Sequence, residues 1–324
     1  MKKTSKKAPA KKAEKKTVIV TGGAGFLGAS LVPALVDAGY SVHVVDSLVS
    51  GKKERVPKEA TLHVIDIRDA HAVEGLFAGI ALNSAIHCVF HLAALPRVQF
   101  SIDHPRESHD TNVNGLLNVF EAARKAKARR IVYSASSSAY GDQTTMPLQE
   151  DMKPNPKSPY AAQKFYGEVL AKQYALHYGV ETVCLRYFNI FGPSFDPNGP
   201  YAMAIGKFLV AAKEGRPLTV TGDGSQTRDS VYATDVARAN ILAMESPKVG
   251  KGETINIGSG KNRSVLEMAK LIAGRNGKIE HVAPRVEPHD TKADISKAKE
   301  LLGWEPKVEF EKGIAELKKL SGIR

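Results

Sequence analysis

Short apolar runs alternate with stretches of helical period along the first half of the chain, and this alternation limits the fold more than any other feature. The runs rich in β-branched residues are 17–21, 41–45, 61–65, 85–92, 130–134 and 182–187. Between the first two, Leu27, Leu31 and Leu35 recur every four residues, which is typical of a helix with one buried face. Apolar strands that alternate with helices form a parallel sheet covered on both faces. The sequence therefore predicts an α/β fold with a doubly wound, Rossmann-type sheet.

The pattern changes at Asn189, where loops rich in Gly and Pro, such as 191–200 and 220–229, replace the regular alternation. We expect a sheet domain over residues 17–188, to which a segment at about 229–258 returns, and a smaller lobe over residues 189–324. In a doubly wound sheet, ligands bind beyond the carboxyl ends of the strands. The residues that follow the predicted strands are therefore the candidates for chemistry.

The chain carries a net charge of +12, but the charge is concentrated at the start. Residues 1–16 contain eight Lys and one Glu and have almost no large apolar side chain. Such a segment cannot bury enough apolar surface to offset its ordering entropy, so we predict a disordered basic tail. A solubilising role for the tail is favoured over nucleic-acid contact, and contact with an anionic surface stays open.

Several other classes of protein are disfavoured. No apolar run approaches the roughly 18 residues of a membrane helix, and the start of the chain lacks the apolar stretch of a signal peptide. We therefore expect a cytoplasmic protein that does not associate with membranes. The two cysteines, Cys88 and Cys184, lie in separate apolar runs without a CxxC pair or a Cys/His cluster. No metal site and no disulfide framework are expected.

The first predicted strand runs directly into the segment TGGAGFLG. Gly23, Gly25 and Gly28 fit the pattern GxGxxG, and Gly22, Gly25 and Gly28 fit GxxGxxG. Both frames give a tight turn whose backbone approaches a pyrophosphate at a helix N-terminus. The second predicted strand ends at Asp46, 18 residues after Gly28. A carboxylate there suits a free ribose and repels a 2′-phosphate, so NAD is favoured as the cofactor.

Two points around this site stay open. Lys52 and Lys53 follow Asp46 closely, so NADP remains a minority alternative. Asp66 ends the third predicted strand, where it either accepts a hydrogen bond from the adenine amine or is a solvated residue of a turn.

Tyr160 and Lys164 form a second candidate constellation. Ser158 and Pro159 occupy the N-cap and first position of a predicted helix, so Tyr160 and Lys164 lie one turn apart on one face. A phenol needs help to act as a base at neutral pH, and a neighbouring ammonium, an oxidised nicotinamide and a helix N-terminus each favour the phenolate. The strand before this helix delivers hydroxyl groups to the same sheet edge, from Ser134, Ser136, Ser137 and Ser138.

These segments, together with HLAA (91–94), NVNG (112–115), SASSSAYGD (134–142) and LRYFNIFGP (185–193), resemble the extended short-chain dehydrogenase/reductases, in particular the UDP-sugar 4-epimerases. The resemblance covers about residues 17–310. It implies bound NAD and a catalytic set of Ser136, Tyr160 and Lys164, with Lys164 also bonding the nicotinamide ribose. The implied contacts of the cofactor are Gly22, Gly25, Phe26 and Leu27 at the pyrophosphate, Asp46 at the ribose, Asp66 and Ile67 at the adenine, and Leu92, Ala93, Ala94, Asn112, Ser134 and Tyr187 toward the nicotinamide. Pro96 stands where many galactose epimerases have a lysine that touches the cofactor.

The resemblance also implies a UDP-sugar substrate. Asn189, Arg228 and Arg285 match the family's ligands of the UDP diphosphate, and residues 196–205 resemble the segment that wraps the uridine. Thr291 matches a wall of the sugar pocket where strictly glucose/galactose enzymes can carry tyrosine, so we expect N-acetylated sugars to fit. The implied reaction is 4-epimerisation of a UDP-hexose, UDP-glucose and/or UDP-N-acetylglucosamine, through a transient 4-keto sugar.

Three alternatives remain open. A UDP-glucuronate 4-epimerase keeps the same serine-rich strand. A dehydratase or decarboxylase of this fold needs an added carboxylate just after the catalytic hydroxyl, and here Ser136 is followed by Ser137, Ser138 and Ala139. A non-catalytic dinucleotide-binding regulator is disfavoured by the complete Ser/Tyr/Lys set.

Homodimerisation through the helical stretches 112–126 and 160–179 is the expected assembly.

Overall fold

The computed structural model describes residues 15–194, 204–274, 277–283 and 289–323. Residues 1–14 of the predicted basic tail, most of the segment 196–205, and Arg285 lie outside these ranges. Within them, no helix is long and apolar enough to cross a membrane, and no cluster of three or more His, Cys, Asp or Glu side chains could hold a metal ion.

Seven parallel strands form the large sheet, in the order β10-β6-β5-β4-β1-β2-β3. Their bounds are β1 Thr17–Thr21, β2 Ser41–Asp46, β3 Thr61–Val64, β4 Ile86–His91, β5 Arg130–Ser136, β6 Glu181–Tyr187 and β10 Lys251–Ile257. All six predicted runs are strands, and the predicted doubly wound fold is confirmed. The strand order reverses beside β1, which pairs with both β2 and β4. This switch point opens the crevice in which doubly wound folds bind their ligands.

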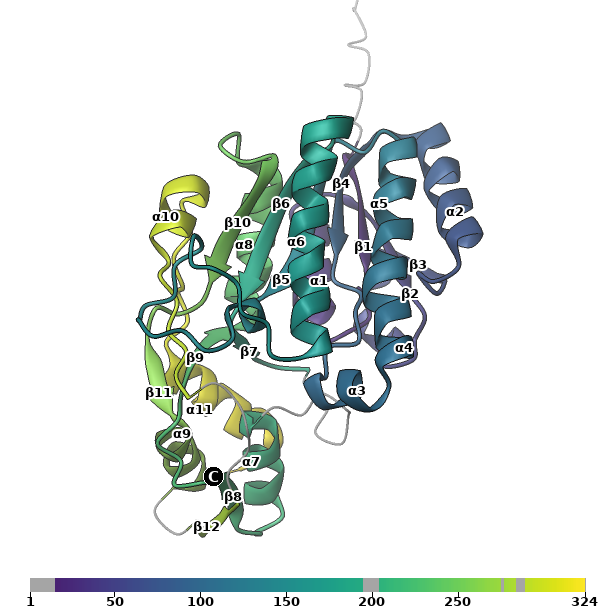
Figure 1. Cartoon of the computed structure of the whole chain (residues 1–324). Coiled ribbons are helices and arrows are strands. Elements are labelled where there is room, and N and C mark those ends of the chain that lie inside the picture. The colour runs from purple at the N-terminus through teal and green to yellow at the C-terminus, as the bar shows by residue number, and fades with distance from the viewer. Residues whose placement is uncertain (1–14, 195–203, 275–276, 284–288, 324) are drawn as a thin grey trace, which may run out of the picture.

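Helices cover both faces of the sheet (Figure 1). On one face lie α2 (Ala70–Asn83), α5 (Leu116–Lys125) and α6 (Pro159–Tyr178), and on the other lie α1 (Gly28–Asp37) and α8 (Ala233–Glu245). Side chains along β1 alternate between the two cores. Val18 and Val20 pack with Leu31 of α1, whereas Ile19 packs with Phe120 of α5, and all five are fully buried. Burial on both faces explains why the strands are apolar throughout.

A smaller lobe lies beyond the carboxyl ends of the large sheet (Figure 1). It contains a three-stranded sheet, β11-β9-β7, and a two-stranded sheet, β12-β8. The bounds of its elements are β7 Asn189–Phe191, α7 Ala204–Lys213, β8 Leu218–Thr221, β9 Thr227–Tyr232, β11 Asn262–Ser264, α9 Val265–Ala273, β12 Ile279–Val282 and α11 Phe310–Ser321. A further helix, α10 (Ser296–Leu302), packs instead against the core of the large sheet through Ala298 and Leu302. The lobe has its own core, which includes Phe208, Ile272 and Phe310.

A buried ion pair fixes α6 to the large sheet. The guanidinium of Arg186 on β6 donates to both carboxylate oxygens of Glu168 on α6, at 2.7 Å each, and both side chains are at most 5% exposed. The same guanidinium lies 4.5 Å from the centre of the Tyr140 ring. Removing one partner of such a pair would leave a buried charge uncompensated. The pair therefore holds α6, and with it Tyr160 and Lys164, in one position relative to β6.

Candidate active site

A cavity of about 590 Å³ occupies the carboxyl edge of the large sheet. Residues of both lobes line it, from Gly22 after β1 to Thr291 before α10. Each described residue that the sequence assigned to cofactor, catalysis or substrate lines this cavity, with the exception of Asn112. Residues far apart in the chain thus meet here, because the carboxyl ends of parallel strands share one edge.

The glycine-rich turn after β1 fits a bound pyrophosphate. Gly22 has a φ of +71°, and a Cβ at this position would lie 2.6 Å from the backbone nitrogen of Ala93. At Gly28, a Cβ would lie 2.2 Å from the carbonyl oxygen of Gly23. Gly22 therefore lies too close to the backbone after β4, and Gly28 too close to the turn, for either position to carry a side chain. Phe26, Leu27 and Gly28, where α1 begins, line the cavity, so the positive end of this helix faces it and favours an anion.

Asp46, the last residue of β2, binds the glycine-rich turn through its side chain. Its Oδ2 accepts a hydrogen bond from the amide of Ala24 at 3.0 Å, and its Oδ1 accepts one from Leu48 at 2.8 Å. Burial raises the pKa of Asp46, while these two hydrogen bonds and the charge of Arg55 act in the opposite direction. A carboxylate has about four acceptor sites, so Asp46 can hold the turn and still accept ribose hydroxyls.

Asp66 begins a turn after β3, where its Oδ1 accepts a hydrogen bond from the amide of Arg68 at 2.9 Å. The guanidinium of Arg68 donates to its Oδ2 through Nε at 3.0 Å and through Nη2 at 2.6 Å. This fork lowers the pKa of Asp66. Arg68 also lines the cavity, and the sequence analysis missed it although it lies two residues further on.

Asn112 is not among the residues that line the cavity, so its expected place on the nicotinamide side stays a prediction. The residue is 4% exposed and lies in a short π-helical segment, Asp110–Gly115. Its Oδ1 accepts from the amide of Leu95 at 2.8 Å, and its Nδ2 donates to the carbonyl oxygen of Leu95 at 3.1 Å and to Oε1 of Gln163 at 2.8 Å. Asn112 therefore supports the loop 92–96 from behind and joins it to α6. Leu92, Ala93 and Ala94 in front of it do line the cavity.

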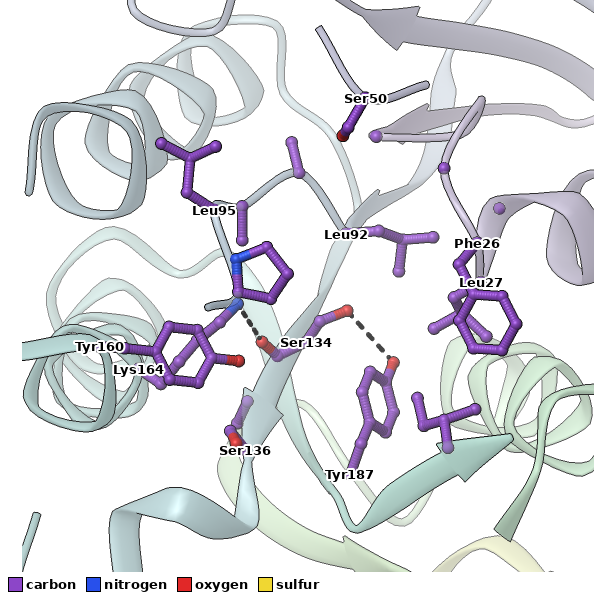
Figure 2. A pocket seen from close by; sticks show the side chains of 18 of the residues that line it. Phe26, Leu27, Ser50, Leu92, Leu95, Ser134, Ser136, Tyr160, Lys164 and Tyr187 are labelled. Carbon is purple, nitrogen blue, oxygen red and sulfur yellow. Dashed lines mark hydrogen bonds between the residues drawn. The ribbon is translucent and has the colours of Figure 1, made fainter. Parts of the chain in front are cut away.

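Ser134, Ser136, Tyr160 and Lys164 converge where β5 ends beside the start of α6 (Figure 2). Ser158 caps α6 by accepting a hydrogen bond from the amide of Ala161 at 3.2 Å, as predicted. Lys164 donates to the carbonyl oxygen of Ser134 at 2.9 Å. The Ser136 hydroxyl accepts from the amide and the hydroxyl of Ser138, at 3.2 and 2.9 Å, and also hydrogen-bonds Tyr160.

Tyr187 extends this arrangement on the other side of Ser134. The Ser134 hydroxyl donates to the Tyr187 hydroxyl at 3.2 Å, which itself donates to Oδ1 of Asn240 on α8 at 2.9 Å (Figure 2 draws the first bond). The chain of hydrogen bonds links the ends of β5 and β6 to a helix on the far side of the sheet.

The protein's own groups do not produce a phenolate at Tyr160. Burial raises the pKa of Tyr160 to about 12, and the hydrogen bond with Ser136 opposes this shift. Burial also lowers the pKa of Lys164 to about 8, and its ammonium is directed at Ser134 instead of the phenol. Lys164 is not among the groups that shift the pKa of Tyr160, so its expected support of the phenolate stays a prediction.

Residues of the smaller lobe form the opposite wall. Nδ2 of Asn189 on β7 donates to the carbonyl oxygen of Asp229 at 3.1 Å, and Oγ1 of Thr291 accepts from the amide of Asp229 at 3.2 Å. Arg228 on β9 donates through Nη1 to the carbonyl oxygens of Thr227 and His289, at 2.8 and 3.0 Å. Sequence reasoning missed Asp229, although it directly follows Arg228.

Comparisons with known proteins identify the class. The model of the NAD dependent epimerase/dehydratase family matches residues 18–258, and the chain belongs to this family. The predicted resemblance and the predicted cofactor, NAD, are thereby confirmed.

Among particular proteins, the chain is similar to a UDP-glucose 4-epimerase of Mycolicibacterium smegmatis, with 36% identity over 92% of this chain and 96% of the relative. It is 36% identical to a UDP-N-acetyl-alpha-D-glucosaminuronate decarboxylase of Bacillus cytotoxicus, over 93% of this chain and 96% of the relative. The crystal structure of a Thermotoga maritima UDP-glucose 4-epimerase with UDP-glucose has a TM-score of 0.89 and 36% identity, and the match covers 94% of this chain and 99% of that one.

Replacing Asp46 with Ser tests its place at the ribose. Asp46→Ser removes both the acceptor for ribose hydroxyls and the charge that repels a 2′-phosphate, so we expect weaker NAD binding and a reduced preference over NADP. Titration of cofactor-free protein with NAD and NADP measures both changes. A wild-type protein that already prefers NADP would contradict the assignment.

Proposed function

We propose that this protein is an NAD-dependent UDP-sugar 4-epimerase that acts on UDP-hexoses, including N-acetylated ones. In this proposal residues 17–188, with a segment at about 229–258, bind NAD, and residues 189–324 bind the UDP-sugar. The observation that carries it is the convergence of Ser136, Tyr160 and Lys164 at one end of a cavity that both lobes line. A regulator that only binds a dinucleotide would not need this set at the reacting end.

The residues of the site have distinct roles in the proposed cycle. Tyr160 takes the proton from the sugar 4-hydroxyl and later returns it, while the hydroxyl of Ser136 holds the same oxygen. Lys164 bonds the nicotinamide ribose and brings positive charge to the phenol end of the cavity. NAD, held by the glycine-rich turn and Asp46, would supply the acceptor for the hydride from C4 of the sugar and, once reduced, the donor that converts the 4-keto sugar back to an alcohol. The positive nicotinamide ring of the oxidised cofactor would add to the charge of Lys164 in favouring the phenolate.

The substrate residues fit the diphosphate. Asn189 has a second amide hydrogen beyond the one that Asp229 accepts, and both Asn189 and Arg228 line the cavity. A diphosphate dianion needs about two charge-assisted donors, and a guanidinium can bond two oxygens at once. Arg285 is the second proposed arginine and lies outside the described residues.

The positions of the carboxylates that line the cavity support epimerisation over dehydration or decarboxylation in this proposal. Within the described ranges, the acidic residues that line it are Asp46, Asp66 and Glu107. Asp46 is the last residue of β2, Asp66 follows β3, and the charge of Glu107 helps to raise the pKa of Arg68 beside them. None of them follows Ser136, where a second acid or base would be needed.

A direct assay tests the proposal. Purified protein is incubated separately with UDP-glucose, UDP-N-acetylglucosamine and UDP-glucuronate, without added cofactor, and proton NMR identifies the products. The 4-epimer of the first or second sugar supports the proposal. Conversion of UDP-glucuronate alone, a 6-deoxy-4-keto product or a pentose would replace it with the corresponding rival activity.

Tyr160→Phe removes the proton-transfer group and little else. We expect turnover to fall about 100-fold or more, the usual scale for the loss of a general acid/base, while NAD and UDP binding stay near those of the wild type. Steady-state kinetics and binding titrations measure the two effects. A variant that kept more than a tenth of the wild-type rate would show that another group moves the proton.

Thr291→Tyr tests which sugars the pocket admits. Thr291 lines the cavity, and its amide donates to the carbonyl oxygen of Thr227 at 3.2 Å, so its position in the wall is fixed. A bulkier residue there should block an N-acetyl group more than a hydroxyl. We expect kcat/KM for UDP-N-acetylglucosamine to fall about 10-fold relative to UDP-glucose. Equal losses for both sugars would place Thr291 elsewhere.

We also propose that the protein forms a homodimer through α5 and α6. Large apolar side chains stand exposed on these two helices, namely Leu117, Tyr166, Val169, Leu176 and Tyr178. Pairing the two helices with those of a second copy would bury them in a four-helix bundle. Light scattering checks this, because the monomer has a mass of 35.0 kDa.

A further inference from the structure

Arg55 joins the two sides of the cavity by a single hydrogen bond. It is the last residue of a short 3₁₀ helix, Lys53–Arg55, in the loop that follows β2, and it lines the cavity. Its Nη2 donates to the carbonyl oxygen of Ser194 at 2.6 Å. Ser194 belongs to the smaller lobe, three residues after the end of β7. The two partners are 139 residues apart in the sequence.

Both ends of this contact are anchored. On the first side, the amide of Lys52 donates to the carbonyl oxygen of Ala24 in the glycine-rich turn at 2.9 Å. A Cβ on Gly51 would lie 2.5 Å from Oδ1 of Asp46, so the loop also passes directly over that carboxylate. On the second side, a Cβ on Gly192 would lie 2.8 Å from the Cβ of Ala233, so the chain after β7 packs closely on α8.

The contact crosses the adenosine half of the cavity. Arg55 is close enough to Asp46 that its charge acts to lower the pKa of that carboxyl group, and Asp46 is the residue that we place at the adenosine ribose. The catalytic side chains Tyr160 and Lys164 lie at the other end, where β5 meets α6. An interaction at Arg55 can therefore change how long NAD stays bound without contacting the reacting atoms.

We propose that the Arg55–Ser194 hydrogen bond is a clasp that slows the release of NAD. A guanidinium that donates to a carbonyl oxygen forms a charge-assisted hydrogen bond, which is stronger than a neutral one. In this proposal the hydrogen bond has to break before the adenosine half of NAD leaves the cavity. Interactions of this kind alter dissociation rates more than association rates. Slow release suits the proposed epimerisation, on which this point rests, because the reduced cofactor would be oxidised back to NAD within every turnover.

The test measures NAD release without any sugar. Protein loaded with NAD is mixed with an excess of the fluorescent analogue 1,N⁶-etheno-NAD, and the exchange is followed over time. Arg55→Met keeps the length of the side chain and removes its donors, and we expect release about 10-fold faster than in the wild type. Lys53→Met removes a charge from the same 3₁₀ helix at an exposed residue, and we expect its release rate and activity to match the wild type.

Three results would overturn the clasp. The first is an unchanged release rate in Arg55→Met. The second is an equal acceleration in Lys53→Met, which would indicate a general effect of charge. The third is an Arg55→Met variant that binds NADP more weakly but releases NAD normally, which would make Arg55 a group for a 2′-phosphate.

A second variant guards against misfolding. Arg55→Lys keeps the charge and most of the packing but loses the planar fork of donors, so we expect a release rate between those of the wild type and Arg55→Met. Normal melting curves for both variants show that their release rates report on this contact and not on misfolding. Because no sugar is present, these outcomes do not depend on the proposed 4-epimerase activity.

Discussion

The buried carboxylate of Asp229 holds the two lobes together, and the substrate side of the cavity depends on it. Oδ1 accepts from the amide and hydroxyl of Ser259, at 2.6 and 2.7 Å, and Oδ2 accepts from the amides of Gly260 and Ala293, at 2.9 and 3.0 Å. Burial raises the pKa of Asp229, and these hydrogen bonds act against the shift. A carboxylate with this many donors is stabilised in its charged form despite being removed from water.

The segments that meet at Asp229 come from different layers of the fold. Asp229 lies on β9 of the smaller lobe, Ser259 and Gly260 follow β10 of the large sheet, and Ala293 precedes α10. The backbone of Asp229 binds the side chains of Asn189 and Thr291, two residues that we assign to the substrate. One buried aspartate thus sets where the substrate wall stands relative to the sheet.

The reacting end of the cavity is organised by burial in the same way. The Arg186–Glu168 pair fixes α6 to β6, and Lys164 reaches from α6 to the carbonyl oxygen of Ser134 on β5. Removal from water then shifts the pKa of Tyr160 upward and that of Lys164 downward. Burial therefore favours the neutral form of both groups, and a positive charge brought into this end of the cavity would favour the phenolate of Tyr160.

The sequence alone determined the strands, their parallel arrangement, the glycine-rich turn with Asp46, and the Tyr160–Lys164 face, because each of these depends on local periodicity or on residues a few positions apart. The family and its cofactor followed from the same short segments. The tertiary structure alone decided the contacts of Asn112, Asp229 and Arg55. The sequence places Asn112 on the nicotinamide side, and the structure shows its side-chain amide bonded to Leu95 and Gln163 behind the loop that lines the cavity. Asp229 and Arg55 act through partners 30 to 139 residues away, and no local pattern encodes such contacts.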